Sequence, residues 1–210
     1  KIRLSQFNRT SLQKYTTLVM VSGSYSQLNQ EDINKIKEWV EKGNTLITIG
    51  SASSWAIKKN IVKESLVKSP KDSIFSRKRY VDARENIGKE RIGGSILSVD
   101  LDLTHPLAFG YRDSSIPVYK NNNVFISKTK SNYSSVAIYS KNPHIDGFVS
   151  KKNMKHNIIG SSSLIVSGVK SGRVIIFADN PNFRGSWYGT NKLFLNAIFL
   201  GQNISAPKGQ

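Results

Sequence analysis

Ser51, His105 and Asp179 are the side chains in this sequence that come nearest to a hydrolytic set. The run Gly50-Ser51-Ala52-Ser53 directly follows an apolar segment, which is where α/β enzymes mount a nucleophilic serine. A serine nucleophile needs a histidine base and an acid that orients it, and His105 and Asp179 are the candidates for these roles. The G-x-S-x-G motif itself is absent. The alternative is that the serines only cap the following helix, so no catalytic residue is assigned and Ser51 and His105 stay as candidates.

Metal and cofactor chemistry finds little support in the residue types. The chain has three histidines, and none of them stands in an H-x-x-E, H-E-x-x-H or H-x-H pair. It has no cysteine, which excludes disulfides, thiolate metal sites and a thiol nucleophile. Neither a Walker lysine motif nor a G-x-G-x-x-G run occurs. We therefore expect no metal site and no cofactor in this chain.

A turn-rich loop with aromatic residues follows the last apolar segment, over residues 179–188. Open α/β sheets bind ligands at the carboxyl ends of their strands, so this loop is a candidate platform for a ligand or partner. In the alternative, the aromatic rings cover the end of the core while Arg184 pairs with Asp179 or a backbone carbonyl. The candidate binding residues at these strand ends are Ser24, Ser53, Trp55, Asp179, Asn180, Arg184 and Trp187.

The first 50 residues predict a strand–helix–strand unit. Residues 16–21 and 45–49 are continuous β-branched and apolar runs, typical of strands buried on both faces. Between them Asn29 is a candidate helix N-cap, and Ile33, Ile36 and Val40 share one helix face. Such a crossover makes the two strands parallel.

Further strands are expected at 95–101, 124–127, 135–140, 164–169 and 173–177, with a hairpin joining the last two. Short helices are expected at 54–60 and 191–200. The prediction is one three-layer α/β/α domain over 1–201 with a mostly parallel sheet and β-rich insertions. Residues 61–94 and 112–160 are expected to be surface excursions, and 202–210 a frayed polar tail.

The 210-residue chain carries a formal net charge of +17, which suggests an anionic partner. Residues 58–91 hold eleven Lys and Arg against five acids, and 120–155 hold seven against one. No signature of a nucleic-acid-binding fold accompanies them, so nucleic acid is not the expected partner. An anionic cell-surface polymer remains open. No apolar run reaches the length of a membrane span.

Five segments resemble known families. Residues 15–25 (YTTLVMVSGSY) and 36–51 (IKEWVEKGNTLITIGS) resemble the class I glutamine-amidotransferase-like, or flavodoxin-like, fold. Residues 104–110 (THPLAFG) resemble the His-Pro loop of trehalose-utilisation-type domains. Residues 172–184 (GRVIIFADNPNFR) and 187–199 (WYGTNKLFLNAIF) resemble the module that follows the zinc carboxypeptidase domain in secreted bacterial proteins.

The sequence departs from the amidotransferase pattern at its catalytic positions. Amidotransferases of this family that hydrolyse glutamine use a cysteine at the strand–helix elbow, where this chain has Gly50-Ser51-Ala52, and the late His-x-Glu partner is also missing. We therefore expect no glutaminase activity. The first βα unit of the fold is not visible either. Residues 1–4 are a candidate for its second strand, in which case an upstream strand is missing or the sheet is short.

The resemblance implies a non-catalytic interaction module, carried at the carboxyl end of an exported zinc-carboxypeptidase-like protein. The implied partner is the upstream peptidase domain, and the implied location is the periplasm, the cell surface or the medium. The first alternative is a hydrolase that uses Ser51 and His105. The second is a polyanion-binding module that uses the basic residues of 58–91 and 120–155.

Overall fold

A computed structural model describes residues 1–68, 77 and 79–205 of the chain. Its centre is a seven-stranded sheet with the strand order β1-β2-β7-β6-β5-β3-β4. The strands are β1 (Thr17–Met20), β2 (Thr45–Ile49), β3 (Ser95–Leu101), β4 (Ser115–Lys120), β5 (Ser135–Gly147), β6 (Ser162–Val169) and β7 (Gly172–Phe177). The α-helices are α1 (Gln30–Glu41), α2 (Ser51–Lys58), α3 (Ala83–Lys89), α4 (Lys151–Asn153) and α5 (Tyr188–Leu200).

The strand–helix–strand unit predicted for the first 50 residues is present. Asn29 caps α1 in a reciprocal capping box, in which its side chain accepts from the Asp32 amide and the Asp32 carboxylate accepts from the Asn29 amide. β1 and β2 are parallel, and β2 also pairs in parallel with β7. Because these three strands are parallel, the loops after Met20, Ile49 and Phe177 all lie at the carboxyl ends of the strands.

The other half of the sheet is antiparallel, which makes the whole sheet mixed. β6 and β7 form the predicted hairpin, and β5, β3 and β4 continue the alternation. Residues 112–160, expected to be a surface excursion or insertion, supply two strands of this sheet. β5 contains the strand expected at 135–140, whereas β4 is a strand that the sequence did not predict. Pro117 and the polar residues of β4 argue against a strand in the sequence. They are tolerated because β4 is the edge strand of the sheet, and Pro117 is exposed there.

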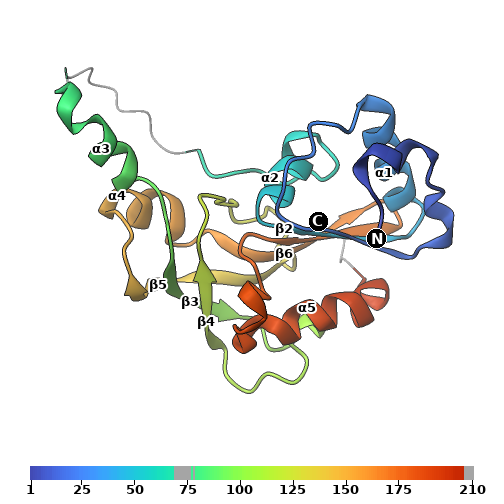
Figure 1. Cartoon of the computed structure of the whole chain (residues 1–210). Helices are drawn as coiled ribbons and strands as arrows, with labels where there is room; N and C mark the ends of the chain where they lie inside the picture. Colours follow the sequence, from blue (N-terminus) through green and yellow to red (C-terminus); the bar gives the residue numbers. More distant parts are fainter. Residues whose placement is uncertain (69–76, 78, 206–210) are drawn as a thin grey trace.

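Helices cover both faces of the sheet, so the three-layer α/β/α architecture is confirmed. Figure 1 shows α1 and α2 on one face and α5 on the other, with α3 and α4 near the antiparallel end. Alternate residues of the central strands feed two hydrophobic clusters. Val174 and Ile176 of β7 pack beneath α1 and α2, whereas Ile175 and Phe177 pack toward α5.

Several local predictions need correction. Residues 1–4 form no strand, because a 3-10 helix spans Leu4–Arg9. Residues 124–127 contribute only isolated bridges, from Ile126 to Leu66 and to Ser162. The start of the expected frayed tail is packed, since Ile204 is 4% exposed. Residues 206–210 of that tail, and 69–76 and 78 of the expected excursion 61–94, lie outside the described residues.

Candidate functional site

The turn between β2 and α2 has the backbone form of a nucleophile elbow but lacks a nucleophile. Gly50 holds φ 57° and ψ −118° at the point where the strand turns into the helix. A Cβ built on Gly50 would lie 2.1 Å from Ser22 Oγ. The Ser22 hydroxyl is fixed there, since it donates to the Ile49 carbonyl at 3.1 Å and accepts from the Ser51 amide at 3.3 Å. The volume that a side chain at the elbow would need is therefore taken by Ser22.

Ser51 lies one residue beyond the elbow and serves the local backbone. Its hydroxyl donates to the Gly23 carbonyl at 3.0 Å and accepts from the Gly23 amide at 2.9 Å. These bonds tie the loop after β1 to the first turn of α2. Within the part of the chain that the structure describes, neither a histidine nor a carboxylate is hydrogen-bonded to the Ser51 hydroxyl.

His105 and Ser51 lie at opposite ends of the strands, so the predicted pairing of Ser51 with His105 is wrong. It follows β3, and β3 runs antiparallel to β7 through the alternation of β5 and β6. The last residues of β3 therefore lie beside the first residues of β2 and β7 along the strand direction. His105 shares a pocket there with Asp102, Asn203 and Ile204.

The His105 ring has a structural task. Its Nδ1 accepts from the Leu107 amide at 3.1 Å and so caps the 3-10 helix Pro106–Ala108. Burial lowers the pKa of His105, and the nearby Asp102 opposes that shift. The neutral ring, with its proton on Nε2, is the form that can accept this bond.

Asp179 is the centre of a buried polar network at the end of β7. Its Oδ1 accepts from Lys120 Nζ at 3.0 Å, and its Oδ2 accepts from Ser163 Oγ at 2.9 Å and from the Tyr139 hydroxyl. The side chains of Lys120 and Asp179 are 0% and 7% exposed. The Lys120 ammonium also donates to the Val124 carbonyl at 2.8 Å. Buried charges are tolerated when they are paired and hydrogen-bonded in this way.

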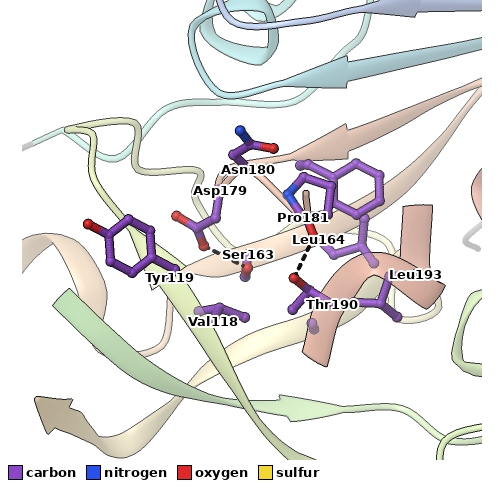
Figure 2. A pocket seen from close by; sticks show the side chains of 11 residues that line it. Val118, Tyr119, Ser163, Leu164, Asp179, Asn180, Pro181, Thr190 and Leu193 are labelled. Atoms are coloured by element: carbon purple, nitrogen blue, oxygen red, sulfur yellow. Dashed lines mark hydrogen bonds between the residues drawn. The ribbon is translucent and has the colours of Figure 1, made fainter. Parts of the chain in front are cut away.

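The network leaves little room for a ligand. Figure 2 shows the small pocket beside it, with Asp179 and Ser163 on one side and Thr190 on the other. Its volume is about 10 Å³, which suits at most one water molecule. Burial and the Asp179 carboxylate raise the pKa of Tyr139 well above its ordinary value, so its hydroxyl keeps its proton and donates it to Asp179. The charged and hydroxyl groups of this network are buried and bond one another.

The network adjoins the elbow. The Asn122 side-chain amide donates to the Ala178 carbonyl at 3.1 Å and lies 3.9 Å from the Cβ position of Gly50. The Gly50 amide donates to the Phe177 carbonyl at 2.9 Å. The candidate site is thus a continuous patch of satisfied polar groups across the ends of β2, β7 and β4.

The aromatic loop packs partly onto the sheet. Phe183 stacks on Tyr119 with centroids 4.0 Å apart, and Trp187 lies tilted against the same ring at 5.9 Å. Arg184 is exposed and lies over the Phe183 ring at 5.4 Å. Asp179 pairs with Lys120, so the expected Arg184–Asp179 pair is not formed. Asn180 is half-buried, and its Oδ1 accepts from the Asn182 amide.

The remaining candidate residues have mixed placements. Ser53 is fully buried and donates to the Phe177 carbonyl at 2.8 Å, which makes it part of the core. Trp55 is half-buried against Tyr25, with ring centroids 5.3 Å apart. Ser24 is exposed in the loop after β1, with its hydroxyl 3.2 Å from that of Ser26. Of these three, Ser24 alone offers an exposed polar group at the strand ends.

The two basic regions meet in space. Lys58 from the first and Lys152 from the second line one polar pocket of about 380 Å³, together with Asn123 and Phe125. Arg77 and Arg79 are exposed, and Lys78 lies outside the described residues.

Sequence reasoning misses Ser22, Lys120, Tyr139 and Ser163. In the sequence, Lys120 is only one cation of a basic region. It is separated from Asp179 by 59 residues, and only the strand order brings the two charges together. The available signal is a lysine at the end of an alternating segment, in which Ile116 and Val118 share its inward face.

Within the described residues, no group of three or more metal-ligating side chains is close enough to hold a metal ion. The helices found among those residues are too short or too polar to cross a bilayer.

The three layers and the mixed sheet are similar to the class I glutamine-amidotransferase-like fold, and solved structures support that likeness. A candidate GMP synthase subunit from Thermoplasma acidophilum matches with TM-score 0.52 and 14% identity over 91% of this chain and 74% of its own. PurLQS from Thermotoga maritima matches with TM-score 0.56 and 14% identity over 90% and 81%. A candidate ThuA-like protein from Bacteroides uniformis matches with TM-score 0.54 and 14% identity over 94% and 74%.

No protein-family model and no curated protein sequence matches the chain. At these identities, the likeness to solved structures concerns the fold.

Proposed function

We propose that this chain is a non-catalytic interaction module built on the amidotransferase-like fold. The observation that carries the proposal is the elbow, where Gly50 stands in the nucleophile's place and Ser22 Oγ occupies the space of its side chain. Nucleophilic catalysis requires an activated side chain within hydrogen-bond reach of a base. His105, the base that the hydrolytic hypothesis needs, lies at the opposite ends of the strands from Ser51.

The partner in this proposal is an upstream zinc-carboxypeptidase-like domain in the same, exported polypeptide. The support is the similarity of residues 172–199 to the module that follows such domains. In that setting the module docks on the peptidase domain or shapes the access of its substrate. Any metal chemistry then belongs to the upstream domain.

Turnover assays test the catalytic part of the proposal. The purified chain is incubated with glutamine, with p-nitrophenyl acetate and with a peptide amide, beside Ser51→Ala and His105→Asn variants. We expect no turnover above the uncatalysed rate for any of the three proteins. Turnover by the wild-type chain that falls at least tenfold in both variants would contradict the proposal.

A second candidate function is polyanion binding, favoured by the pocket that Lys58 and Lys152 share. The Lys58 ammonium at this pocket fits a sulfate, carboxylate or phosphate group of an anionic polymer. The Glu90 carboxylate lines the same pocket and opposes that binding. Binding of a heparin oligosaccharide would then weaken linearly with the logarithm of the salt concentration. Lys58→Met should reduce both the affinity and that slope, whereas Lys14→Met, an exposed lysine in neither basic region, should not. No binding at low salt would remove this candidate.

A further inference from the structure

Residues 80–89 form a short helical segment that projects from the domain. It consists of a 3-10 turn, Tyr80–Asp82, followed directly by α3. Figure 1 shows α3, in green, standing out from the domain next to α4. None of the residues in the turn or in α3 is buried. An isolated helix of about ten residues is only marginally stable in water, so this segment would gain from a binding partner.

The outer side of this segment carries large apolar side chains. Tyr80 is 95% exposed, Val81 is 70% exposed and Ile87 is 66% exposed. Tyr80 and Ile87 are seven residues apart, which places them on the same side of the helix. Single exposed apolar residues are ordinary, but a group of them on one helix marks an interaction surface.

Two arginines lie beside these apolar side chains. Arg84 stands four residues after Tyr80 and Arg91 four residues after Ile87, and both arginines are exposed. The helical turn continues to Arg91, since its amide donates to the Gly88 carbonyl at 3.1 Å. In the part of the chain that the structure describes, neither arginine forms an ion pair. Both guanidinium groups are therefore available to an external anion.

The carboxylates of the same segment have partners or face the domain. Asp82 Oδ2 lies 3.9 Å from Arg79 Nε, and Glu85 Oε1 lies 2.5 Å from Lys89 Nζ. Glu90 is half-buried and lines a polar pocket of the domain. The charge that remains unpaired on the outer side is therefore positive.

We infer that this outer side docks on an anionic lipid surface. We call it the α3 face and define it by Tyr80, Val81, Arg84, Ile87 and Arg91. Its arginines would contact the lipid headgroups, and its apolar side chains would enter the boundary between headgroups and acyl chains. The helix would lie in the plane of the membrane, since it is far too short to span one. The inference does not depend on the proposed upstream domain.

The composition of the α3 face favours lipid over other anionic partners. Nucleic acids and acidic polysaccharides attract cations and can stack on a tyrosine ring, but they give Val81 and Ile87 no apolar environment. A second copy of the chain is disfavoured, because each copy carries a net charge of +17 and would bring an unpaired Arg84 to the interface. Because α3 projects from the domain (Figure 1), a flat surface can contact it directly.

Co-sedimentation with lipid vesicles tests the inference. The chain is mixed with vesicles of phosphatidylcholine and phosphatidylserine, and with vesicles of phosphatidylcholine alone. Binding to the mixed vesicles should be at least tenfold tighter and should weaken as the salt concentration rises. The α3 amides should exchange more slowly with deuterium when the mixed vesicles are present.

Two double variants separate the apolar and the charged contributions. Y80S/I87S should reduce the affinity for mixed vesicles at least tenfold, because less apolar surface leaves water. R84Q/R91Q should reduce it about fivefold for each arginine, and only on vesicles that contain phosphatidylserine. The substituted side chains are exposed, so the midpoint of urea unfolding should stay unchanged in both variants.

Matched controls lie elsewhere on the surface. Phe199→Ser removes an aromatic side chain that is 75% exposed on α5, and Lys14→Gln removes an exposed cation. Both controls should bind the mixed vesicles like the wild type. Heparin separates lipid docking from polyanion binding, since Y80S/I87S should leave the affinity for heparin unchanged.

Three results would overturn the inference. The first is no binding to the mixed vesicles. The second is vesicle binding that Y80S/I87S leaves unchanged and Lys58→Met removes, which would assign the lipid to the Lys58 pocket. The third is an equal loss of vesicle and heparin binding in Y80S/I87S, which would show that the α3 face does not distinguish lipid from a soluble polyanion. Each of these results would leave the proposal of a non-catalytic module standing, because that proposal is tested by turnover.

Discussion

Single residues decide what the strand-end site can do. Gly50 adopts the positive-φ turn of an elbow without a side chain, and Ser22 Oγ lies 2.1 Å from where its Cβ would be. The sequence alone shows that cysteine is missing and that Gly50-Ser51-Ala52 stands in its place. It could not show Ser22 closing the position, because that contact joins two loops 28 residues apart.

Gly50→Ala should therefore destabilise the chain more than an ordinary glycine substitution. The positive φ costs about 1–3 kcal/mol, and the collision with Ser22 Oγ adds about 1–3 kcal/mol as overpacking. Urea denaturation measures the loss. Gly160→Ala is the matched control, since Gly160 has φ +74° but no atom within 4 Å of its Cβ position.

The double variant S22A/G50A should recover part of that loss, because the colliding oxygen is gone. Equal costs for Gly50→Ala and Gly160→Ala, with no recovery in the double variant, would show that Ser22 does not fill the elbow.

The Lys120–Asp179 pair should behave as a buried ion pair. Asp179→Asn leaves the Lys120 ammonium without its counter-charge, and removing one partner of such a pair costs about 3–5 kcal/mol. The double variant K120M/D179N should cost less than the sum of the two single variants. Equilibrium unfolding in urea gives the four free energies.

Lys170→Met is the control for this cycle. It breaks the Lys170–Glu41 pair, whose lysine side chain is 70% exposed, and should cost less than about 1 kcal/mol. An Asp179→Asn cost as small as this would contradict the structural role of the network.

His105 should make stability fall with acid. Burial lowers its pKa in the folded chain, whereas the unfolded chain titrates near about 6.5. The unfolded state then binds more protons as the pH drops below that value. The stabilisation is present above it and is lost as the pH falls through the folded pKa.

The stability difference between wild type and His105→Asn should therefore shrink from pH 7.5 to pH 5. Asparagine can still accept the Leu107 amide bond but does not titrate. His156→Asn, at an exposed position, is the control. A difference that stays constant or grows on acidification would contradict the burial of the His105 ring.

At the scale of elements, the sequence predicts the parallel half of the sheet well and the antiparallel half poorly. The β1–α1–β2 unit is readable because its strands are continuous apolar runs and Asn29 marks the helix start. β4 is not readable from the sequence, because Pro117 and Lys120 are untypical of a strand that packs on a core. In the structure, Lys120 is buried because Asp179 pairs with it. The extent of β5, to Gly147, depends on pairing with β3 across two register shifts, which no local pattern encodes.

The packing of α1 on the start of β7 should depend on Gly172. A Cβ there would lie 1.8 Å from the Val40 carbonyl oxygen and 2.6 Å from that of Asn44. Both are backbone atoms, so the helix end would have to shift. Gly172→Ala should cost at least about 3 kcal/mol in unfolding free energy, at the upper end of overpacking effects.

Gly93→Ala is the control for Gly172, since nothing lies within 4 Å of its Cβ position and its φ lies outside the positive range. A Gly172→Ala cost similar to that of the control would show that α1 and β7 are packed less closely than described.

At the scale of the whole molecule, the core and the strand ends are built from different sets of residues. Two hydrophobic clusters on opposite faces of one sheet hold the domain together. The carboxyl ends of the parallel strands, where open α/β sheets place ligands, carry Ser22, Asn122 and the Lys120–Asp179 network. Among the described residues, the unpaired edge of β1 and the polar pocket lined by Lys58 are two surfaces that face solvent.

The intact mass of the native protein in separated cell fractions tests the central claim most directly. An antibody against this chain would detect it in the medium, the cell envelope and the cytoplasm. The account predicts a species much larger than 23.4 kDa outside the cytoplasm, whose activity resides in the upstream domain. A species of 23.4 kDa, or one confined to the cytoplasm, would contradict it.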